Sequence, residues 1–445
     1  MMKVLLIYSP FCTPATPPYA IANIYSFLKV NSVDVDILDL NLEFHKLKFP
    51  KEYDYYRDFI LEDYEEKTNE FMKESSKIYS ENNKKIVKGE KPESFDELIE
   101  LIRSKKPDLV AFSVVYSSQV FYTKALIEEL NKEGIKCVIG GPAINDKLKE
   151  KATFCNNEFE LLNHINSSIK PNKAKVHDYI DFSSFQDYFI KEKNKVLPIK
   201  TCTTCYYKQC AFCTHHQHTC YYEFPLEFIE KTITKNNSKY WFFIDDMIHE
   251  KRLLQIAEIM KQKKVIWTCQ LRPTKFSKET LQTLSDSGLK MIIWGVESGN
   301  DRVLKLMRKG TNKIEISQIL KDSHIAGIKN VIYTMFGFPT ETKEEFIETI
   351  KFLQENNEYI DLVSTSIFGL QKGTVIYDRP DLFEIKKIHE KKRTVLEPKI
   401  TYDVESGLTN EEATKLRQKY KKTIEKINKY PKTMNFFREH MLIID

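Results

Sequence analysis

Short apolar segments alternate with helical segments over two long stretches of this 445-residue chain. In the first stretch, apolar runs at 3–8 (KVLLIY), 33–38, 109–113 (LVAFS) and 137–142 (CVIGGP) predict four strands, with a helix at 122–131 between the last two. Uninterrupted apolar strands are typical of parallel sheets that are covered on both faces. The order therefore predicts an α/β fold that begins with a Rossmann-like, doubly wound parallel sheet, whose ligand crevice lies at the carboxyl ends of the strands.

The second stretch, from about 198 to 375, repeats the strand-then-helix pattern six times. Six units are too few to close an eight-stranded barrel of the TIM type. We therefore expect a partial (β/α)6 barrel with an open side, which can admit a bulky substrate such as a peptide. The carboxyl ends of its strands are the expected place for chemistry.

These changes of pattern divide the chain into four predicted parts. Residues 1–165 form the first sheet domain, with a charged helical insertion at about 45–100. A linker at 166–197 precedes the barrel at 198–375, and a helical extension at 376–445 follows it. In that extension, TNEEATKLRQKYKKTIEKI begins with a capping box and predicts an amphipathic helix.

Four of the nine cysteines lie close together in the segment TCTTCYYKQCAFCTHH. Cys205, Cys210 and Cys213 read C-x4-C-x2-C, a compact loop that can direct three thiolates at one iron–sulfur cluster. Three protein ligands would leave one iron open to a substrate or cofactor. Cys202 extends the string to four cysteines, so a four-cysteine zinc site and an electron-transfer cluster are alternatives. Zinc ribbons separate their cysteine pairs by roughly 15 to 20 residues, which argues against zinc here.

Five further motifs follow the cysteines in order, and each begins as a strand. They are WFFIDD at 241–246, VIWTCQLR at 265–272, MIIWGVESG at 291–299, MFGFPTET at 335–342 and IFGLQKGT from 367. Together with the cysteine loop, these motifs resemble the radical S-adenosylmethionine (radical SAM) enzymes, in particular the branch with an N-terminal cobalamin-binding domain.

The resemblance implies that the three cysteines bind a 4Fe–4S cluster whose open iron chelates the methionine part of SAM. Phe212 fills the place of an aromatic residue that precedes the last cysteine in the family. Four residues separate Cys205 from Cys210, whereas the family usually has three. The longer spacing is similar to that of a sub-branch that includes peptide-modifying enzymes. The Ser-Arg-Gly that tends to precede the first cysteine is replaced by Cys-Thr-Thr.

Residues at the ends of the predicted strands are candidates to bind SAM. In the family, the WFFIDD position helps to hold the amino group or ribose of SAM. An arginine can give a carboxylate a bidentate contact, and a glutamate can accept hydrogen bonds from ribose hydroxyls or an ammonium group. For Asp246 the alternative is the N-cap of the helix that LLQIAEIM predicts. The candidates are Phe212, Asp245, Asp246, Arg272, Glu297, Gly337 and Pro339.

The start of the chain is also similar to the cobalamin-binding domain of that branch, whose PPxxLAxL-like segment corresponds here to PPYAIANI. On this resemblance, Ser113, Gly140 and Gly141 are the candidate cobalamin contacts. The chain lacks the Asp-x-His-x-x-Gly motif that ligates cobalt in other cobalamin proteins, and its segment 143–162 is short. The alternative is a Rossmann-like domain that binds nothing, because a fold supplies a crevice without fixing its ligand.

The resemblance implies an enzyme whose reduced cluster cleaves SAM to a 5′-deoxyadenosyl radical, which abstracts hydrogen from a small-molecule or peptide substrate. With cobalamin the outcome is C-methylation, and without it epimerisation, crosslinking, cyclisation or rearrangement. A reductase such as flavodoxin or ferredoxin is the expected electron donor. The alternative of another class is a non-catalytic iron–sulfur electron carrier, which would need the cysteines but not Arg272, Glu297 or GFPTET.

Charge and hydropathy limit the classes of partner that the sequence predicts. The net charge of +5 is spread along the chain with acidic residues interleaved, so no nucleic-acid partner is expected. The sequence has neither a signal peptide nor an apolar run of about 18 residues, so we expect a soluble cytoplasmic protein without a membrane contact.

Overall fold

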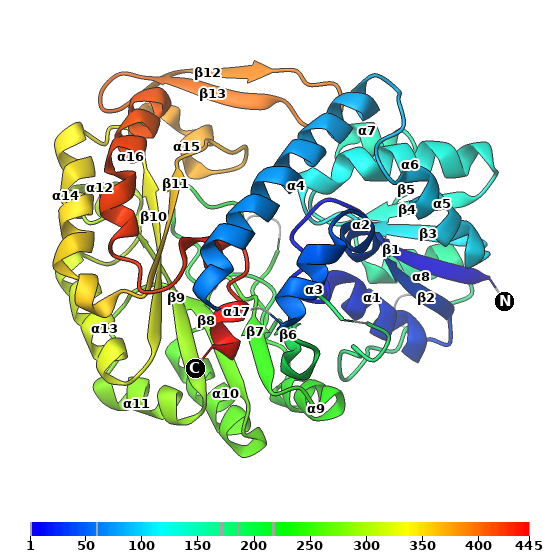
Figure 1. Ribbon diagram of the computed structural model, residues 1–445, viewed down its shortest axis with the longest axis horizontal. Coiled ribbons are helices and arrows are strands. Elements are labelled where there is room, and N and C mark those ends of the chain that lie inside the picture. The colour runs from blue at the N-terminus through cyan, green and yellow to red at the C-terminus, as the bar shows by residue number, and fades with distance from the viewer. Residues whose placement is uncertain (1, 59–60, 170–172, 186, 216–218, 445) are drawn as a thin grey trace. The chain divides into compact units, whose positions relative to one another are not determined.

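The computed structural model describes residues 1–445 except 1, 59–60, 170–172, 186, 216–218 and 445 (Figure 1). The chain forms two compact units. One comprises residues 1–195, 231–237 and 392–397, and the other comprises 196–230, 238–391 and 398–445. The four-part division of the chain made from the sequence remains a prediction.

A five-stranded parallel sheet is the centre of the first unit. Its strand order is β2-β1-β3-β4-β5, and all four strand pairs run parallel. Four of the strands are those expected from the sequence, and β5 is a short addition of two residues. The strands are β1 (Lys3–Tyr8), β2 (Asp34–Asp39), β3 (Leu109–Ser113), β4 (Lys136–Gly140) and β5 (Thr153–Phe154).

Helices cover this sheet and complete its core. Val4, Leu6 and Leu109 of the strands pack with Phe27 and Leu28 of α1, and all five side chains are almost fully buried. Leu5 and Ile7, which point to the opposite face of β1, are buried as well, so the sheet is apolar on both faces, as the uninterrupted apolar runs predict. The helices are α1 (Tyr19–Val30), α2 (Leu40–Lys48), α3 (Pro50–Asp58), α4 (Tyr64–Val87), α5 (Phe95–Ser104), α6 (Val120–Lys132), α7 (Asp146–Lys149) and α8 (Glu158–Ile165).

The charged insertion forms a long helix with a buried stripe. α4 is charged overall, but residues spaced three or four apart along it are buried, including Phe71, Ile78 and Ile86. Such spacing places these side chains on one face of the helix. The aromatic ring of Phe71 contacts those of Tyr56 and Phe189. The insertion is thus an integral part of the first unit's packing.

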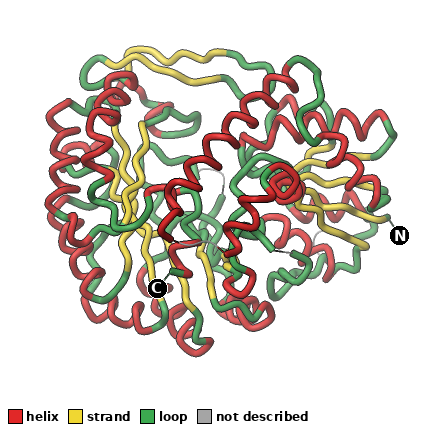
Figure 2. The backbone as a smooth tube through the Cα atoms, in the orientation of Figure 1, coloured by secondary structure: helices red, strands yellow, loops and turns green. Residues whose placement is uncertain are grey.

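A six-stranded, all-parallel sheet organises the second unit, in the order β11-β10-β9-β8-β7-β6. Figure 2 shows these strands in yellow with helices beside them. The order is sequential, as expected for a partial (β/α)6 barrel, and the predicted α/β class is confirmed. The strands are β6 (Val196–Ile199), β7 (Tyr240–Phe243), β8 (Ile266–Leu271), β9 (Leu289–Glu297), β10 (Lys329–Phe336) and β11 (Leu362–Ile367).

Three buried tryptophans fix the packing of the middle strands. Trp241 pairs with Trp267 across β7 and β8, and Trp294 lies on β9 opposite Leu271. Each indole N–H has an acceptor: Trp294 donates to Asn330 Oδ1 at 2.7 Å, for example. Large aromatic side chains are buried without an orphaned donor in this way.

Helices follow the strands of the second unit and begin with side-chain caps. Asn300, Ser277 and Thr342, for instance, each accept a hydrogen bond from the backbone of the helix that they precede. These helices are α9 (Leu226–Asn236), α10 (Glu250–Lys263), α11 (Lys278–Asp286), α12 (Asp301–Leu306), α13 (Lys313–Ile325), α14 (Lys343–Glu355) and α15 (Val375–Asp378).

The C-terminal segment is helical only in part. The predicted amphipathic helix is α16 (Asn410–Glu425), and Thr409 and Glu412 form its capping box. A short helix α17 (His440–Ile443) follows. Before them, β12 (Ile385–Lys391) and β13 (Lys399–Val404) form an antiparallel pair that the sequence analysis did not anticipate. Both strands are rich in charged residues and largely exposed, so they lack the apolar signal that identifies the other strands.

Candidate functional site

The loop that carries the three cysteines follows β6 and is held at its centre by backbone hydrogen bonds. Ala211 donates its N–H to Met307 O at 3.0 Å, and its carbonyl accepts from Ile376 N at 3.2 Å. Cys205, Cys210 and Cys213 flank this anchor and are each partly buried. Burial raises the pKa of Cys213 to about 11, and the neighbouring thiols of Cys210 and Cys205 add to that increase. The three thiols thus lie close enough to influence one another's ionisation.

The described residues form no single-ion site at these thiols. Within the described part of the chain, no group of three or more His, Cys, Asp or Glu side chains is arranged to hold one metal ion. The sequence spacing still argues against a zinc ribbon, since only four residues separate Cys205 from Cys210.

Cys202 is buried and has partners of its own. It is 1% exposed and forms an isolated antiparallel bridge with Glu223. Its thiol donates to Asp245 Oδ1 at 3.1 Å. Burial, followed by the charge of Asp245, raises the pKa of Cys202 well above its ordinary value. Because this thiol is buried and already donates to a carboxylate of the chain, Cys202 serves the local packing.

Asp245 anchors the start of the cysteine loop. Its Oδ1 accepts the backbone N–H groups of Thr201 at 2.8 Å and Cys202 at 2.9 Å. The residue is 2% exposed, and its Oδ2 has no hydrogen-bond partner among the described residues. Burial raises the pKa of this carboxyl. Asp245 therefore has a structural task, while contact of its second oxygen with SAM remains a prediction.

Asp246 pairs with a histidine and does not cap the next helix. Its Oδ1 lies 2.6 Å from Nδ1 of His215, and the N-cap of α10 is His249. The hydrogen bond that His215 makes to the Asp246 carboxylate is the main reason why the pKa of His215 is raised. The helix-cap alternative for Asp246 is thus wrong. Two further histidines of this segment, at 216 and 218, lie outside the described residues.

Arg272 is held by the chain itself. Its Nη1 donates to the carbonyl oxygens of Lys309 and Gly310, each at 2.9 Å, and its guanidinium lies 3.7 Å from the ring centroid of Tyr207. Its Nε is buried without a partner among the described residues. The predicted contact with the SAM carboxylate would have to use the nitrogens that these bonds leave over.

Glu297 forms a buried ion pair that the sequence analysis missed. Its Oε1 lies 2.9 Å from Nζ of Lys309, and the two side chains are 15% and 8% exposed. Burial by itself would lower the pKa of Lys309, but the charges of Glu297 and Cys210 outweigh it and the pKa is raised. Gly295 makes room for the pair, because a Cβ there would lie 2.9 Å from both charged atoms.

The ion pair lies beside the cysteine loop. The Nζ of Lys309 is 5.9 Å from the ring centroid of Phe212. Burial raises the pKa of Cys210, whereas the positive charges of Lys309 and Arg272 act to lower it. Lysine is rarely buried without a partner, so the lysine near the end of GVESGNDRVLKLMRKG was the only available signal in the sequence. A negatively charged group bound by the thiolates would lie near the positive charges of Lys309 and Arg272.

The GFPT turn after β10 is built around a buried glutamate. Gly337, with φ +71, donates its N–H to Glu341 Oε2, and Oε1 of Glu341 has no partner among the described residues. Burial raises the pKa of Glu341 to about 8. Phe338, which precedes Pro339, packs against Phe212 of the cysteine loop. The predicted SAM positions in this turn and in the loop are therefore neighbours.

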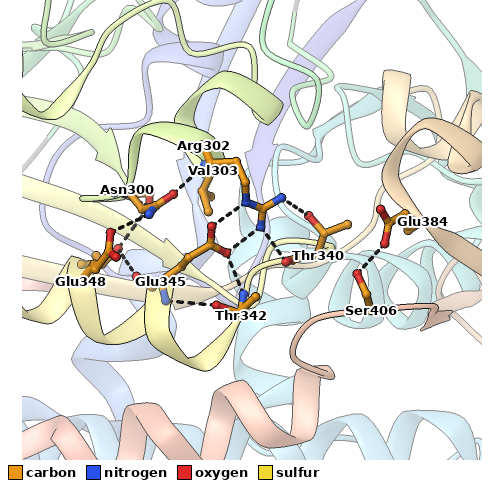
Figure 3. Close-up of polar contacts among 11 residues, drawn as sticks. Asn300, Arg302, Val303, Thr340, Thr342, Glu345, Glu348, Glu384 and Ser406 are labelled. Atoms are coloured by element: carbon orange, nitrogen blue, oxygen red, sulfur yellow. Dashed lines mark hydrogen bonds and ion pairs between the residues drawn. The ribbon is translucent and has the colours of Figure 1, made fainter.

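A polar network fastens the same turn to two helices (Figure 3). Arg302 of α12 donates to both oxygens of Glu345, at 2.5 and 2.6 Å, and to the carbonyl of Thr340 at 2.7 Å. Glu345 and Thr342 form the capping box of α14. A bidentate arginine–carboxylate contact fixes orientation as well as distance, so α12 and α14 position the turn.

The candidate cobalamin residues lie at the carboxyl edge of the first unit's sheet. Tyr8, Ser113 and Gly140 are the last paired residues of β1, β3 and β4 and form one row. Gly141 follows with φ +115, and a Cβ there would lie 2.4 Å from the carbonyl oxygen of Val114. Ser113 and Gly140 therefore lie side by side at this edge. The absence of a side chain at Gly141 is explained by the close approach of Val114, without any ligand.

A buried polar cluster extends this row. Asp39, which pairs with Tyr8 in the sheet register, accepts a hydrogen bond from Tyr188 at 2.6 Å. The thiol of Cys12 lies 3.7 Å from the Tyr8 hydroxyl. Burial raises the pKa of Asp39 to about 6. The strand ends thus offer polar groups where a doubly wound sheet holds its ligand.

Comparison with known proteins agrees with the cysteine loop and the parallel barrel. Residues 199–353 match the family model of the radical SAM superfamily. These residues form a radical SAM domain. The cofactors of such a domain are a 4Fe–4S cluster and SAM.

Relatives by sequence match less than a third of this chain. An uncharacterized methyltransferase of Pyrococcus horikoshii, PH0819, is 27% identical over 140 residues, which is 31% of this chain and 30% of that protein. The tRNA-2-methylthio-N(6)-dimethylallyladenosine synthase of Thermotoga petrophila is 30% identical over 130 residues, or 28% of this chain and 29% of that protein. The matches thus span less than a third of these relatives.

Two solved structures are similar over most of the chain. OxsB, a cobalamin-dependent SAM radical enzyme with aqua-cobalamin and SAM bound, gives a TM-score of 0.56 at 16% identity and covers 86% of this chain and 56% of its own. TsrM, a radical SAM methyltransferase from Kitasatospora setae with cobalamin and a 4Fe–4S cluster bound, gives 0.57 at 12% identity, covering 85% and 77%. At these identities the likeness concerns the fold, and the radical SAM domain here follows a Rossmann-like sheet. Among the described helices, none is long and apolar enough to cross a bilayer.

The Lys309–Glu297 pair gives a first prediction. Lys309→Met should lower the free energy of unfolding by about 3–5 kcal/mol, because it leaves the carboxylate of Glu297 buried without a partner. Lys309→Met/Glu297→Gln should recover most of the loss. Denaturant unfolding of the three proteins measures this. Lys415→Met, which removes an exposed partner of Glu411, is the control; equal losses in the single and double variants would contradict the assignment.

Glu341 gives a second prediction, on pH. The pKa of Glu341 is raised to about 8 in the folded state. Between about pH 4.5 and 8, the folded protein therefore keeps a proton on this carboxyl that the unfolded chain has lost. The stabilisation is complete at the acidic end of this window and is lost as pH rises through about 8. Denaturant unfolding of Glu341→Gln across this window should therefore show less loss of stability than the wild type. Glu344→Gln, at an exposed position, should follow the wild type, and parallel curves for all three proteins would refute the prediction.

Proposed function

We propose that this protein is a radical SAM enzyme that generates a 5′-deoxyadenosyl radical and uses it on a small-molecule or peptide substrate. The observation that carries the proposal is the C-x4-C-x2-C loop, whose three thiols gather after β6 within the region that matches the radical SAM superfamily. The fold similarity to OxsB and TsrM supports it. A non-catalytic electron carrier would need the cysteines but would have no use for the residues at the strand ends, such as Arg272 and Glu297.

Cys205, Cys210 and Cys213 are the residues that would hold the cluster. When bound, a 4Fe–4S cluster and SAM supply one-electron cleavage of a carbon–sulfur bond of SAM, which yields the radical. The chain's part is to bind, to orient and to exclude water. The cations of Lys309 and Arg272 stabilise the thiolate of Cys210, and Phe212 and Phe338 make the adjacent surface apolar.

Strand-end groups would orient SAM. Glu297, kept in place by Lys309, can accept hydrogen bonds from ribose hydroxyls or an ammonium group. Oδ2 of Asp245, which has no partner among the described residues, offers a second acceptor after β7, two strands away in the same sheet. Asp246 would have to contact SAM through its other carboxylate oxygen, because its Oδ1 already accepts a hydrogen bond from His215. The turn at Gly337 and Pro339 would contact the adenine.

The finer proposal is a cobalamin-dependent C-methylation. The polar row at the carboxyl edge of the first sheet, with Ser113 and Gly140 side by side, is the place that would hold the corrinoid. A bound methylcobalamin would supply a methyl group to the substrate radical. The alternative is a cobalamin-independent epimerisation, crosslinking, cyclisation or rearrangement. In either case the electron would come from a reductase such as a flavodoxin or a ferredoxin.

SAM cleavage is the third prediction. After anaerobic reconstitution to about four irons per chain, dithionite and SAM should give 5′-deoxyadenosine and methionine, measured by chromatography. Cys205→Ala, Cys210→Ala and Cys213→Ala should each lose the cluster and this activity. Cys220→Ser, at an exposed cysteine outside the motif, should retain both. A fully loaded wild-type protein that never cleaves SAM would favour the electron carrier.

Corrinoid retention is the fourth prediction. Protein incubated with hydroxocobalamin and passed through a desalting column should keep the visible absorbance of the corrinoid at about one per chain, since one sheet offers one crevice. The Cys205→Ala/Cys210→Ala/Cys213→Ala variant should retain it equally, because its substitutions lie outside the first sheet. Loss of all corrinoid from the wild type would replace methylation with a cobalamin-independent outcome.

A further inference from the structure

The cysteine loop contains an additional residue that the backbone must accommodate. Four residues, Tyr206 to Gln209, separate Cys205 from Cys210. Lys208 adopts φ +55, a left-handed conformation that a lysine rarely takes without support from its surroundings. The loop therefore turns sharply between two of the three cysteines, and something must hold the turn in place.

Tyr207, directly before this turn, makes two contacts with neighbouring segments. Its ring centroid lies 3.7 Å from the guanidinium carbon of Arg272, at the end of β8. Its hydroxyl donates to the carbonyl oxygen of Arg308, just after α12, at 3.0 Å. A planar guanidinium stacked on an aromatic face restricts both groups. The side chain of Tyr207 is thus fixed at both its face and its tip.

The partner of the stack is itself oriented. Arg272 donates to the carbonyls of Lys309 and Gly310, each at 2.9 Å. Gly310 has φ +66, and a Cβ at this position would lie 2.2 Å from the Tyr207 hydroxyl oxygen and 2.7 Å from Arg272 Nη1. Only a residue without a side chain fits beneath this stack. The stack on Arg272, the hydrogen bond of the hydroxyl and the space left by Gly310 thus all favour one position of the Tyr207 side chain.

The segment after α12 accepts hydrogen bonds from the loop on both sides of Cys210. On one side it receives the hydroxyl of Tyr207 at Arg308 O. On the other it receives the backbone N–H of Ala211 at Met307 O. Cys210 lies between these two anchors, which contact adjacent carbonyls. Its position is consequently set from the end of α12 rather than by the loop alone.

The geometry points to Tyr207 as a positioning residue that clamps the longer cysteine loop and so directs the thiols of Cys205 and Cys210. It touches neither thiol in this role and acts through the backbone that carries them. This inference deepens the proposed function, on which its effect upon cofactor binding rests. The clamp itself is a property of the protein chain and can be tested without any cofactor.

The first test measures thiol accessibility in the metal-free chain. Tyr207→Leu removes the stack and the hydrogen bond but keeps an apolar side chain of some bulk. It should increase the rate at which iodoacetamide alkylates Cys205 and Cys210 by about tenfold, the ratio that corresponds to about 1.4 kcal/mol of lost restraint. Mass spectrometry of the peptides reports each cysteine separately. The exposed Cys220 gives the internal reference rate.

Matched variants separate the contributions. Tyr207→Phe keeps the stack and loses only the hydroxyl, so it should rescue most of the effect. Gly310→Ala introduces a Cβ into the stack and should mimic Tyr207→Leu without touching the loop. Tyr206→Phe, in the same loop but with its ring contacts to Tyr221 and His249 retained, should behave as wild type.

The second test measures a spectroscopic signature in the reconstituted protein. Electron paramagnetic resonance of the reduced protein, with and without SAM, should show a clear SAM-dependent change for the wild type, Tyr207→Phe and Tyr206→Phe. Tyr207→Leu and Gly310→Ala should lose that change at equal iron content.

Wild-type alkylation rates and a wild-type response to SAM in Tyr207→Leu and Gly310→Ala would overturn the inference. Failure of the proposed function looks different. In that case the wild type itself would show no SAM response, while the alkylation rates of the metal-free variants would still reveal whether Tyr207 clamps the loop.

Discussion

The buried ion pair between Glu297 and Lys309 is the interaction on which the arrangement of the site depends. It joins the end of β9 to the segment after α12 at 2.9 Å, and that segment in turn binds Arg272 and the cysteine loop. A buried ion pair is a weak source of net stability, because the cost of desolvation offsets the attraction. Its consequence is positional: a carboxylate and two basic side chains are kept beside the thiol of Cys210.

Glycines permit this density of contacts at two points in particular. A side chain at Gly295 would reach Glu297 and Lys309, and one at Gly310 would reach Tyr207 and Arg272. Both positions lie among charged groups that must approach one another closely. The close approach of these charged groups therefore depends on the absence of side chains at Gly295 and Gly310. Even an alanine at either position should displace the neighbouring charged side chains.

Much of the fold could be predicted from the sequence, because parallel strands buried on both faces are apolar throughout. The runs at Lys3–Tyr8 and Leu109–Ser113 coincide with β1 and β3, and the six-stranded barrel sheet follows the expected order. Strand ends could be located for the same reason, which is why Asp245, Arg272 and Glu297 were identifiable. The charged strands of the β12–β13 pair carry no such signal.

The partners of the site residues could not be predicted. Asp246 pairs with His215 and Glu297 with Lys309, and Tyr207 contacts residues far along the chain. Such pairings depend on how loops from different strands meet, which no local pattern specifies. The sequence also could not distinguish the packing role of Cys202 from a metal-binding role, because burial and the hydrogen bond to Asp245 decide it.

We propose that three thiolates of this chain bind a four-iron cluster and leave one iron open to SAM. Mössbauer spectroscopy of protein reconstituted with 57Fe tests this claim directly, because it resolves individual iron environments. We predict that SAM changes the signal of about one iron in four and leaves the other three in place. Four irons that remain unchanged when SAM is added would contradict it.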